Sequence, residues 1–403
     1  MTKDMTSGST LRHIINFAVP LCMGMLFQQL YSMVDTMIVG KVLGVQPLAG
    51  VGATGSLNFM IIWFCLGICN GFSIPIAQAF GASKEVELRR YVANSTWLCV
   101  FFSIVITFFV CIFTRNMLVL LKTPEDIFEY AYIYILIIFL GIPCTFLYNF
   151  LAGVARALGD SKTPLMFLIL SSVMNIALDF ILMIPIPLGV AGAAIATVIS
   201  QGVSGGICLI YMKKKFPILK ASRDEWRMRG NYMKRLCAIG VPMGLQYSIT
   251  AIGSLVITAA VNVLGATAVA GVTAAQKINN LITCPLESLG QTMAPYTGQN
   301  IGAGKKERVS DGVKKASICG FVWSAICIPI VLLFGKPMTL LFLSEPNAEV
   351  VNYSFLFLLV STLGYCLLTL VGTVRFSIQG MGYSGFAMTA GVLEMAARTI
   401  AGV

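Results

Sequence analysis

Long apolar stretches separated by short polar segments make up almost the whole chain. Each stretch holds about 20 residues or more, the length that an α-helix needs to cross ~30 Å of hydrocarbon. A strand of a membrane barrel would be about 10 residues long and would alternate in polarity, so the pattern favours helices. We expect eleven membrane-spanning helices, at 14–39, 48–74, 91–113, 127–152, 164–184, 189–212, 236–262, 270–296, 313–335, 350–374 and 384–403. The predicted fold class is an all-α polytopic membrane protein.

Composition agrees with this pattern. Of the 403 residues, 57% are hydrophobic and only 11% are charged, whereas an ordinary soluble domain carries about 25% charged residues. The first stretch is too long for a cleavable signal and carries Asp35, so we expect it to remain as a helix.

The net charge of +11 is distributed unevenly along the chain. If the N-terminus is cytoplasmic, the N-terminal tail and the loops on the same side hold 22 of the lysines and arginines. The opposite side holds four, which are Lys41, Arg115, Lys122 and Lys336. This asymmetry follows the positive-inside rule and predicts a multi-pass protein of the cell membrane with its N-terminus inside. The basic excess is therefore a topology signal with some attraction to anionic lipid, and we expect no nucleic-acid partner.

The chain contains an internal duplication. The segment VLGVQPLAGVGA begins at Val42 and VLGATAVAGVTA begins at Val263, and seven of their twelve positions are identical. Nearly the same spacing relates further pairs along the chain: Pro20 and Pro242, Gln78 and Gln299, Gly81 and Gly302, Lys84 and Lys305, and ALGDS ending at Ser161 with GMGYS ending at Ser384. An offset that stays almost constant over such a distance indicates two related halves.

The duplication maps the first predicted span onto the seventh, so each half contains six helices in the same orientation. We expect two parallel-oriented six-helix bundles related by a pseudo-two-fold axis along the membrane normal. The predicted domains are residues 1–212, a basic cytoplasmic linker at 213–235, and residues 236–403. Two bundles of six would make twelve helices and eleven are found, so we expect the second bundle to lack its last helix.

Two similar bundles favour transport, because rocking one against the other exposes the interface to each side in turn. The chain has no HExxH, GxSxG or Walker A motif, so we expect neither an enzyme nor an ATPase. The twelve cysteines show no metal-site spacing and His13 is the only histidine. A scaffold or sensor that transports nothing remains the alternative from another class.

Acidic residues inside the spans are the first candidates for function, because a charge in hydrocarbon is costly. Asp35 lies in the first span and Asp179 in the fifth, where Asn175 shares its helical face four residues earlier. Thr197 in the sixth span adds a hydroxyl. Such oxygens suit Na⁺, and two carboxylates in a low dielectric equally favour taking up a proton. The alternative is that each acid only bonds a neighbouring helix.

Other polar residues within the predicted spans give weaker indications of a functional role. Glu287 has Gln291 one turn on and no cation nearby in sequence, so this pair either lines a substrate cavity or bonds between helices. Glu394 and Arg398 are four residues apart and are expected to form a structural ion pair.

The motifs together resemble the multidrug and toxic compound extrusion (MATE) family. The resemblance covers the whole chain in order. It rests on a proline in the first span followed by QQLYSMVD, on RALGDSKTP from Arg156, on the Asn175–Asp179 pair, on GVAGAAIAT ending at Thr197, and on GQNIGA from Gly298.

The resemblance implies a cation-coupled antiporter that exports small, cationic or amphipathic drugs and toxins in exchange for Na⁺ or H⁺. It implies a coupling site at Asp35, Asn175, Asp179 and Thr197, and helix bending at Pro20. One branch of the family also couples through acids in spans seven and ten, which here carry none, so the chain is nearer the branch that works through its N-terminal bundle. A flippase for a lipid-linked precursor is the alternative within transport. No cofactor beyond the coupling ion is expected, and the protein is expected to be a monomer in contact with membrane lipid.

Overall fold

The computed structural model describes residues 3–341 and 347–402. The helices in these ranges are α1 (Thr10–Leu43), α2 (Val45–Ala53), α3 (Gly55–Gly81), α4 (Glu85–Leu120), α5 (Glu125–Leu140), α6 (Ile142–Ala157), α7 (Lys162–Met183), α8 (Val190–Lys215), η1 (Pro217–Leu219), α9 (Gly230–Asn262), α10 (Ala266–Gly302), α11 (Lys306–Leu340), α12 (Ala348–Gly380) and α13 (Ser384–Gly402). No strand occurs within them. The all-α fold class predicted from the sequence is confirmed.

A helix lies at every predicted span, although residue 403 is outside the described ranges. Eight described helices are individually long and apolar enough to cross a membrane, and α5 with α6 forms a ninth such span with a bend of 48°. The other two positions belong to α10 and α13, which fall short of that standard. Polar residues such as Lys277 in α10 and Glu394 in α13 lower their hydropathy.

Two predicted spans are divided into two helices each. The span at 127–152 breaks at Gly141, because Pro143 near the start of α6 has no N–H to continue the hydrogen bonds of α5. The span at 48–74 breaks at Thr54, which lies between Gly52 and Gly55 and whose hydroxyl bonds back to the preceding turn.

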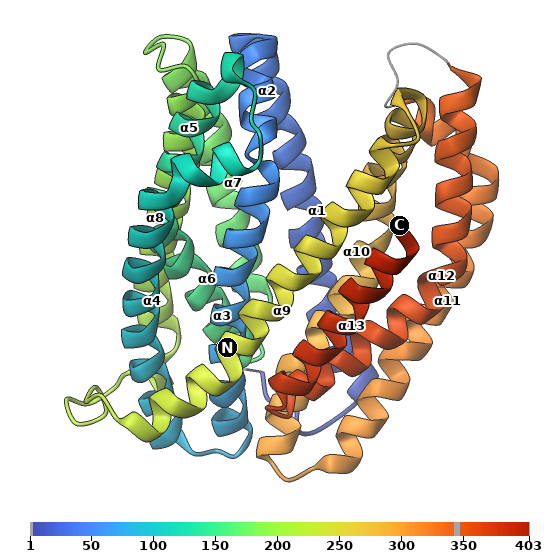
Figure 1. Ribbon diagram of the computed structural model, residues 1–403. Helices are drawn as coiled ribbons and strands as arrows, with labels where there is room; N and C mark the ends of the chain where they lie inside the picture. The colour runs from blue at the N-terminus through green and yellow to red at the C-terminus, as the bar shows by residue number, and fades with distance from the viewer. Residues whose placement is uncertain (1–2, 342–346, 403) are drawn as a thin grey trace.

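Figure 1 shows two groups of helices that diverge toward the upper side of the view. The first group comprises α2 to α8 and the second comprises α10 to α13. The first helix of each half, α1 or α9, crosses between the groups. The early part of α1 packs on the second group through Ile14, Phe17 and Ala18, which form one buried cluster with Leu289, Met293, Tyr296 and Ala316.

Glycines let α9 lie directly against α3. Gly67 and Gly71 on α3 face Gly244 and Gly240 on α9, so each helix contributes a G-x-x-x-G pair. A Cβ atom on Gly67 would lie only 2.6 Å from the Gly244 Cα atom. Small residues at this spacing allow the backbones of membrane helices to touch. The early part of α9 is therefore fixed to the first group.

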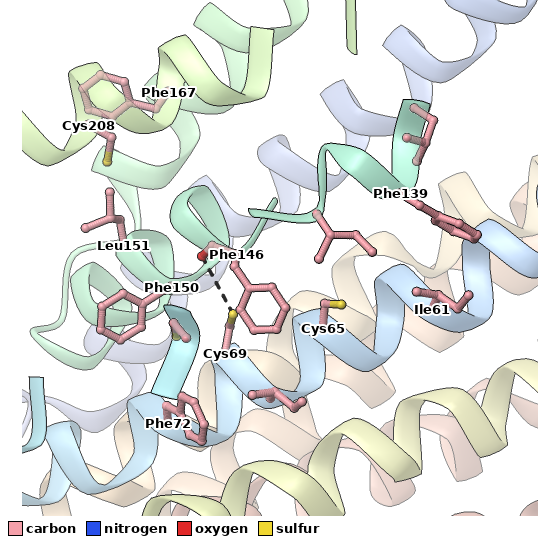
Figure 2. Close-up of a cluster of buried hydrophobic side chains, with 14 of the residues drawn as sticks. Ile61, Cys65, Cys69, Phe72, Phe139, Phe146, Phe150, Leu151, Phe167 and Cys208 are labelled. Carbon is pink, nitrogen blue, oxygen red and sulfur yellow. Dashed lines mark hydrogen bonds between the residues drawn. The ribbon is translucent and has the colours of Figure 1, made fainter. Parts of the chain in front are cut away.

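Aromatic side chains fill the core of the first group around the cysteines of α3 (Figure 2). Cys65 and Cys69 are fully buried, and the Cys69 Sγ atom lies 3.9 Å from the Phe146 carbonyl oxygen. Phe72, one turn further along α3, belongs to the same cluster. These cysteines act as small apolar packing residues.

Candidate functional site

The centre of the candidate site is a pair of carboxyl groups inside the first group of helices. Asp35 projects from α1 and Asp179 from α7, and the two side chains are neighbours where these helices pack together. Asp179 is fully buried. Both of its oxygens, and one oxygen of Asp35, have no hydrogen-bond partner among the described residues. Asp35 is half-buried. Two neighbouring carboxylates without a cation repel each other, so a proton or a metal cation would stabilise the pair.

Asn175 and Thr197 complete the predicted set. The Asn175 amide donates to the Thr197 hydroxyl oxygen at 3.3 Å, and that hydroxyl donates to the Ala193 carbonyl at 3.1 Å within α8. The side-chain amide oxygen of Asn175 is buried without a hydrogen-bond partner among the described residues. The side-chain oxygens of Asn175 and Asp179 therefore remain free on neighbouring turns of α7. Oxygens of this kind are the ligands that a hard cation prefers.

Two tyrosines belong to the site and were absent from the sequence prediction. Tyr31 lies one turn before Asp35 on α1, and Tyr134 comes from α5. Both hydroxyls lie within electrostatic range of Asp35 and Asp179. The four-residue spacing of Tyr31 and Asp35 could have indicated the first. Nothing in the sequence near Tyr134 indicates the second.

A polar cavity of about 90 Å³ adjoins the site, and Asn175 and Thr197 line it. At ~30 Å³ per molecule, a cavity of this size holds about three waters. Hydroxyl and amide groups from four helices surround it: Gln28 and Tyr31 from α1, Thr145 and Asn149 from α6, Ser171 and Ser172 from α7, and Ser200 and Gln201 from α8. Ile62 and Leu66 from α3 are among its apolar residues.

Pro20 lies inside α1, which is a single helix in this structure. It separates the early part of the helix, which packs on the second group, from the part that carries Asp35. A proline removes one backbone hydrogen bond from the helix interior, so this point is the weakest along α1.

Glu287 and Gln291 are on α10 and do not line the 90 Å³ cavity. Glu287 is exposed and lies within electrostatic range of Tyr247 on α9. Among the described residues, no basic group lies within 4.0 Å of Glu287.

The ion pair expected at Glu394 is present and is larger than expected. One Glu394 oxygen accepts from Arg398 at 2.6 Å, and the other accepts from Arg375 on α12 at 2.6 Å. Arg375, one of the 22 cations counted for the tail and loops of the cytoplasmic side, lies inside α12 and is mostly shielded from solvent. Its partner on α13 is nineteen residues away in sequence, beyond the reach of helical spacing.

Comparison with known proteins identifies the family. The family model described as MatE matches residues 20–181 and again residues 242–401. The chain belongs to the MATE family. The two matches begin at Pro20 and Pro242, which the duplication pairs.

Individual MATE relatives align over most of the chain. The probable multidrug resistance protein YpnP of Bacillus subtilis is 30% identical over 355 residues, which cover 88% of this chain and 79% of YpnP. A FAD transporter of Shewanella oneidensis is 24% identical over 360 residues, covering 88% of this chain and 78% of that protein. The protein is therefore a multi-pass membrane transporter of this family.

The fold agrees with solved MATE structures. A crystal structure of MATE in complex with MaL6 superposes with a TM-score of 0.91 at 22% identity, over 97% of this chain and 88% of that one. At this level of identity the likeness concerns the fold.

Proposed function

We propose that this MATE transporter is a cation-driven antiporter that exports drug-like amphipathic molecules. The observation that carries the proposal is the pair formed by a half-buried Asp35 and a fully buried Asp179, which has no compensating cation among the described residues. Such a pair gains most from a bound Na⁺ or from a proton, and both are available as gradients across a cell membrane. Asn175 and Thr197 supply further oxygens beside it.

Coupling follows if the two conformations of the transporter differ in their affinity for the ion. Cation binding at the pair stabilises the arrangement in which α1 and α7 stay together at this point, and this favours release of substrate outside. Loss of the cation to the cytoplasm restores repulsion between the two carboxylates. Repulsion then drives α1 to move, and Pro20 is the point at which that helix bends most easily.

The orientation in the proposal is the one that the charge distribution predicts. The N-terminus and the basic linker face the cytoplasm of the cell membrane, and the helix groups diverge toward the outside (Figure 1). Relatives carry names for multidrug resistance and, in one case, for FAD transport. The substrate is therefore a small molecule, and its charge need not be positive.

The test is export of a fluorescent dye from proteoliposomes, with a pH gradient and a Na⁺ gradient imposed separately. Asp35→Asn and Asp179→Asn should each abolish gradient-driven export, while Glu349→Gln, an exposed acid at the start of α12, should leave it unchanged. The gradient that drives the wild type identifies the ion. Export that persists undiminished in both aspartate variants would refute the coupling site.

A further inference from the structure

Arg156 is a cation without a carboxylate partner. It lies in the last turn of α6 and is half-buried, and its Nη2 atom donates to the Asn70 Oδ1 atom at 2.9 Å. Within residues 3–341 and 347–402, no carboxylate lies within 4.0 Å of the guanidinium. Asn70 is eleven residues before the end of α3, which places this contact about 16 Å from that end at 1.5 Å per residue. A half-buried charge without an ionic partner in a membrane protein is costly and calls for a function.

The surroundings of Arg156 lie at the junction of the two helix groups. The guanidinium is within electrostatic range of Tyr148 on α6 and of Tyr247 on α9. The close contact of Gly67 with Gly244 brings α3 and α9 together beside this point. Arg375 of the second group lies within range of the same Tyr247 hydroxyl, but Glu394 already occupies its guanidinium. Among the described residues, Arg156 is therefore the cation at this junction that no carboxylate neutralises.

The duplication indicates that the fold itself does not require this charge. With the offset that aligns ALGDS with GMGYS, the residue equivalent to Arg156 in the second half is Gln379. Gln379 is fully buried, and its amide donates to the Gln246 side chain at 2.6 Å. In the second half a neutral side chain thus occupies the equivalent position and bonds to Gln246. The positive charge belongs to the first half alone, which favours a ligand over a structural role.

We propose that Arg156 binds an oxyanion of the transported molecule, a carboxylate or a phosphate group. The inference rests on the proposed transport function and specifies the class of its substrate. Asn70 holds one edge of the planar guanidinium and leaves other N–H groups free to form two parallel bonds to an oxyanion. The protein accordingly favours substrates that carry a negative group on an amphipathic body.

A matched pair of dyes tests the proposal on the purified full chain in detergent. One dye carries a single free carboxylate, and the other is the methyl ester of the same dye. Arg156→Gln should weaken binding of the carboxylate dye about tenfold or more and leave binding of the ester unchanged, because loss of a charge-assisted hydrogen bond costs on the order of one decade. Arg223→Gln, an exposed linker arginine, is the control and should change neither.

Three further measurements complete the test. Arg156→Lys retains the charge but loses the paired geometry, so it should bind the carboxylate dye with intermediate affinity and serves if Arg156→Gln does not fold. Inorganic phosphate should compete with the carboxylate dye only. Equal losses for both dyes in Arg156→Gln, or no loss for either, would overturn the proposal. Gradient-driven export of the ester dye by the wild type is measured in parallel, so failure of the transport function is recognised separately.

Discussion

Gln78 and Gln299 are equivalent residues of the two repeats, and each bonds to the last residue of a helix in the opposite group. The Gln78 side-chain amide donates to the Gly380 carbonyl at the end of α12, at 3.0 Å. The Gln299 amide donates to the Ala157 carbonyl at the end of α6, at 2.9 Å. Because helix ends leave carbonyl groups unpaired, these bonds satisfy two acceptors while joining the groups on the side where they converge.

Replacement of Gln299 by alanine should destabilise the protein. The side chain is fully buried, and its Oε1 atom also accepts from the Met5 N–H at 2.9 Å, so the change leaves a buried donor and a buried acceptor unpaired. Each such group costs about 1–3 kcal/mol. Thermal unfolding in detergent measures the loss. Gln46→Ala at an exposed position is the control, and equal melting of the two variants would contradict the assigned bonds.

A methyl group on Gly71 should prevent the contact between α3 and α9. The added Cβ atom would collide with the Gly240 backbone, which cannot move aside as a flexible side chain can. We expect Gly71→Ala to lower the folded yield sharply, as measured by size-exclusion chromatography of the solubilised protein. Gly364→Ala on α12 is the matched control, because no atom lies within 4 Å of its Cβ position. Alanine there should be neutral or stabilise by up to about 1 kcal/mol.

Asp160, in the loop between α6 and α7, should stabilise the protein in a pH-dependent way. Its Oδ1 atom accepts from the Lys162 and Thr163 N–H groups, and its Oδ2 atom accepts from Lys215 at 2.8 Å. Burial alone would raise the pKa of the carboxyl, but the bonds from Lys215 and Thr163 outweigh it and hold the pKa below its ordinary value. The stabilisation is therefore complete above about pH 4 and is lost as pH falls further.

Asp160→Asn keeps the bonds that cap α7 and removes the charge. We expect it to cost about 1.5–3 kcal/mol at pH 7, the range for hydrogen bonds to charged groups. The difference between the variant and the wild type should shrink as the pH falls below 4, because the carboxyl of the unfolded wild type takes up a proton there before that of the folded protein does. Melting curves at pH 7 and at pH 3 provide the measurement. A difference that is independent of pH would show that the charge contributes nothing.

Thr197 should act through its hydroxyl. Thr197→Val preserves shape but leaves the Asn175 amide without its acceptor, so the Asn175 carbonyl is no longer held in place beside Asp179. We expect a higher concentration of the driving ion for half-maximal export in Thr197→Val and a near-normal one in Thr197→Ser. The readout is dye export against ion concentration in proteoliposomes. If export by both variants depended on ion concentration as export by the wild type does, Thr197 would be excluded from the site.

The sequence was sufficient to predict features that depend on local periodicity or on repetition. Apolar runs located the helices, and the spacing of Asn175 and Asp179 placed two site residues on one face of α7. Features that depend on distant packing were not accessible. Tyr134 joins the site because α5 packs on α8, which in turn packs on α7, and Arg375 meets Glu394 across two helices. Arg156, another of the 22 cations counted for the tail and loops, lies inside α6, and its bond to Asn70 depends on packing against a neighbouring helix.

The crossing of α1 has a consequence for how the protein is made. The ribosome delivers α1 to the membrane first, but Phe17 and Ile14 find their partners Leu289 and Met293 only once α10 has been inserted. At about 5–20 residues per second, that delay lasts on the order of 10–60 s. Throughout it, the early part of α1 has lipid or the insertion machinery as its neighbour. Assembly is thus completed by the C-terminal half. Until that half has been inserted, the early part of α1 lacks the residues that cover it in the folded protein.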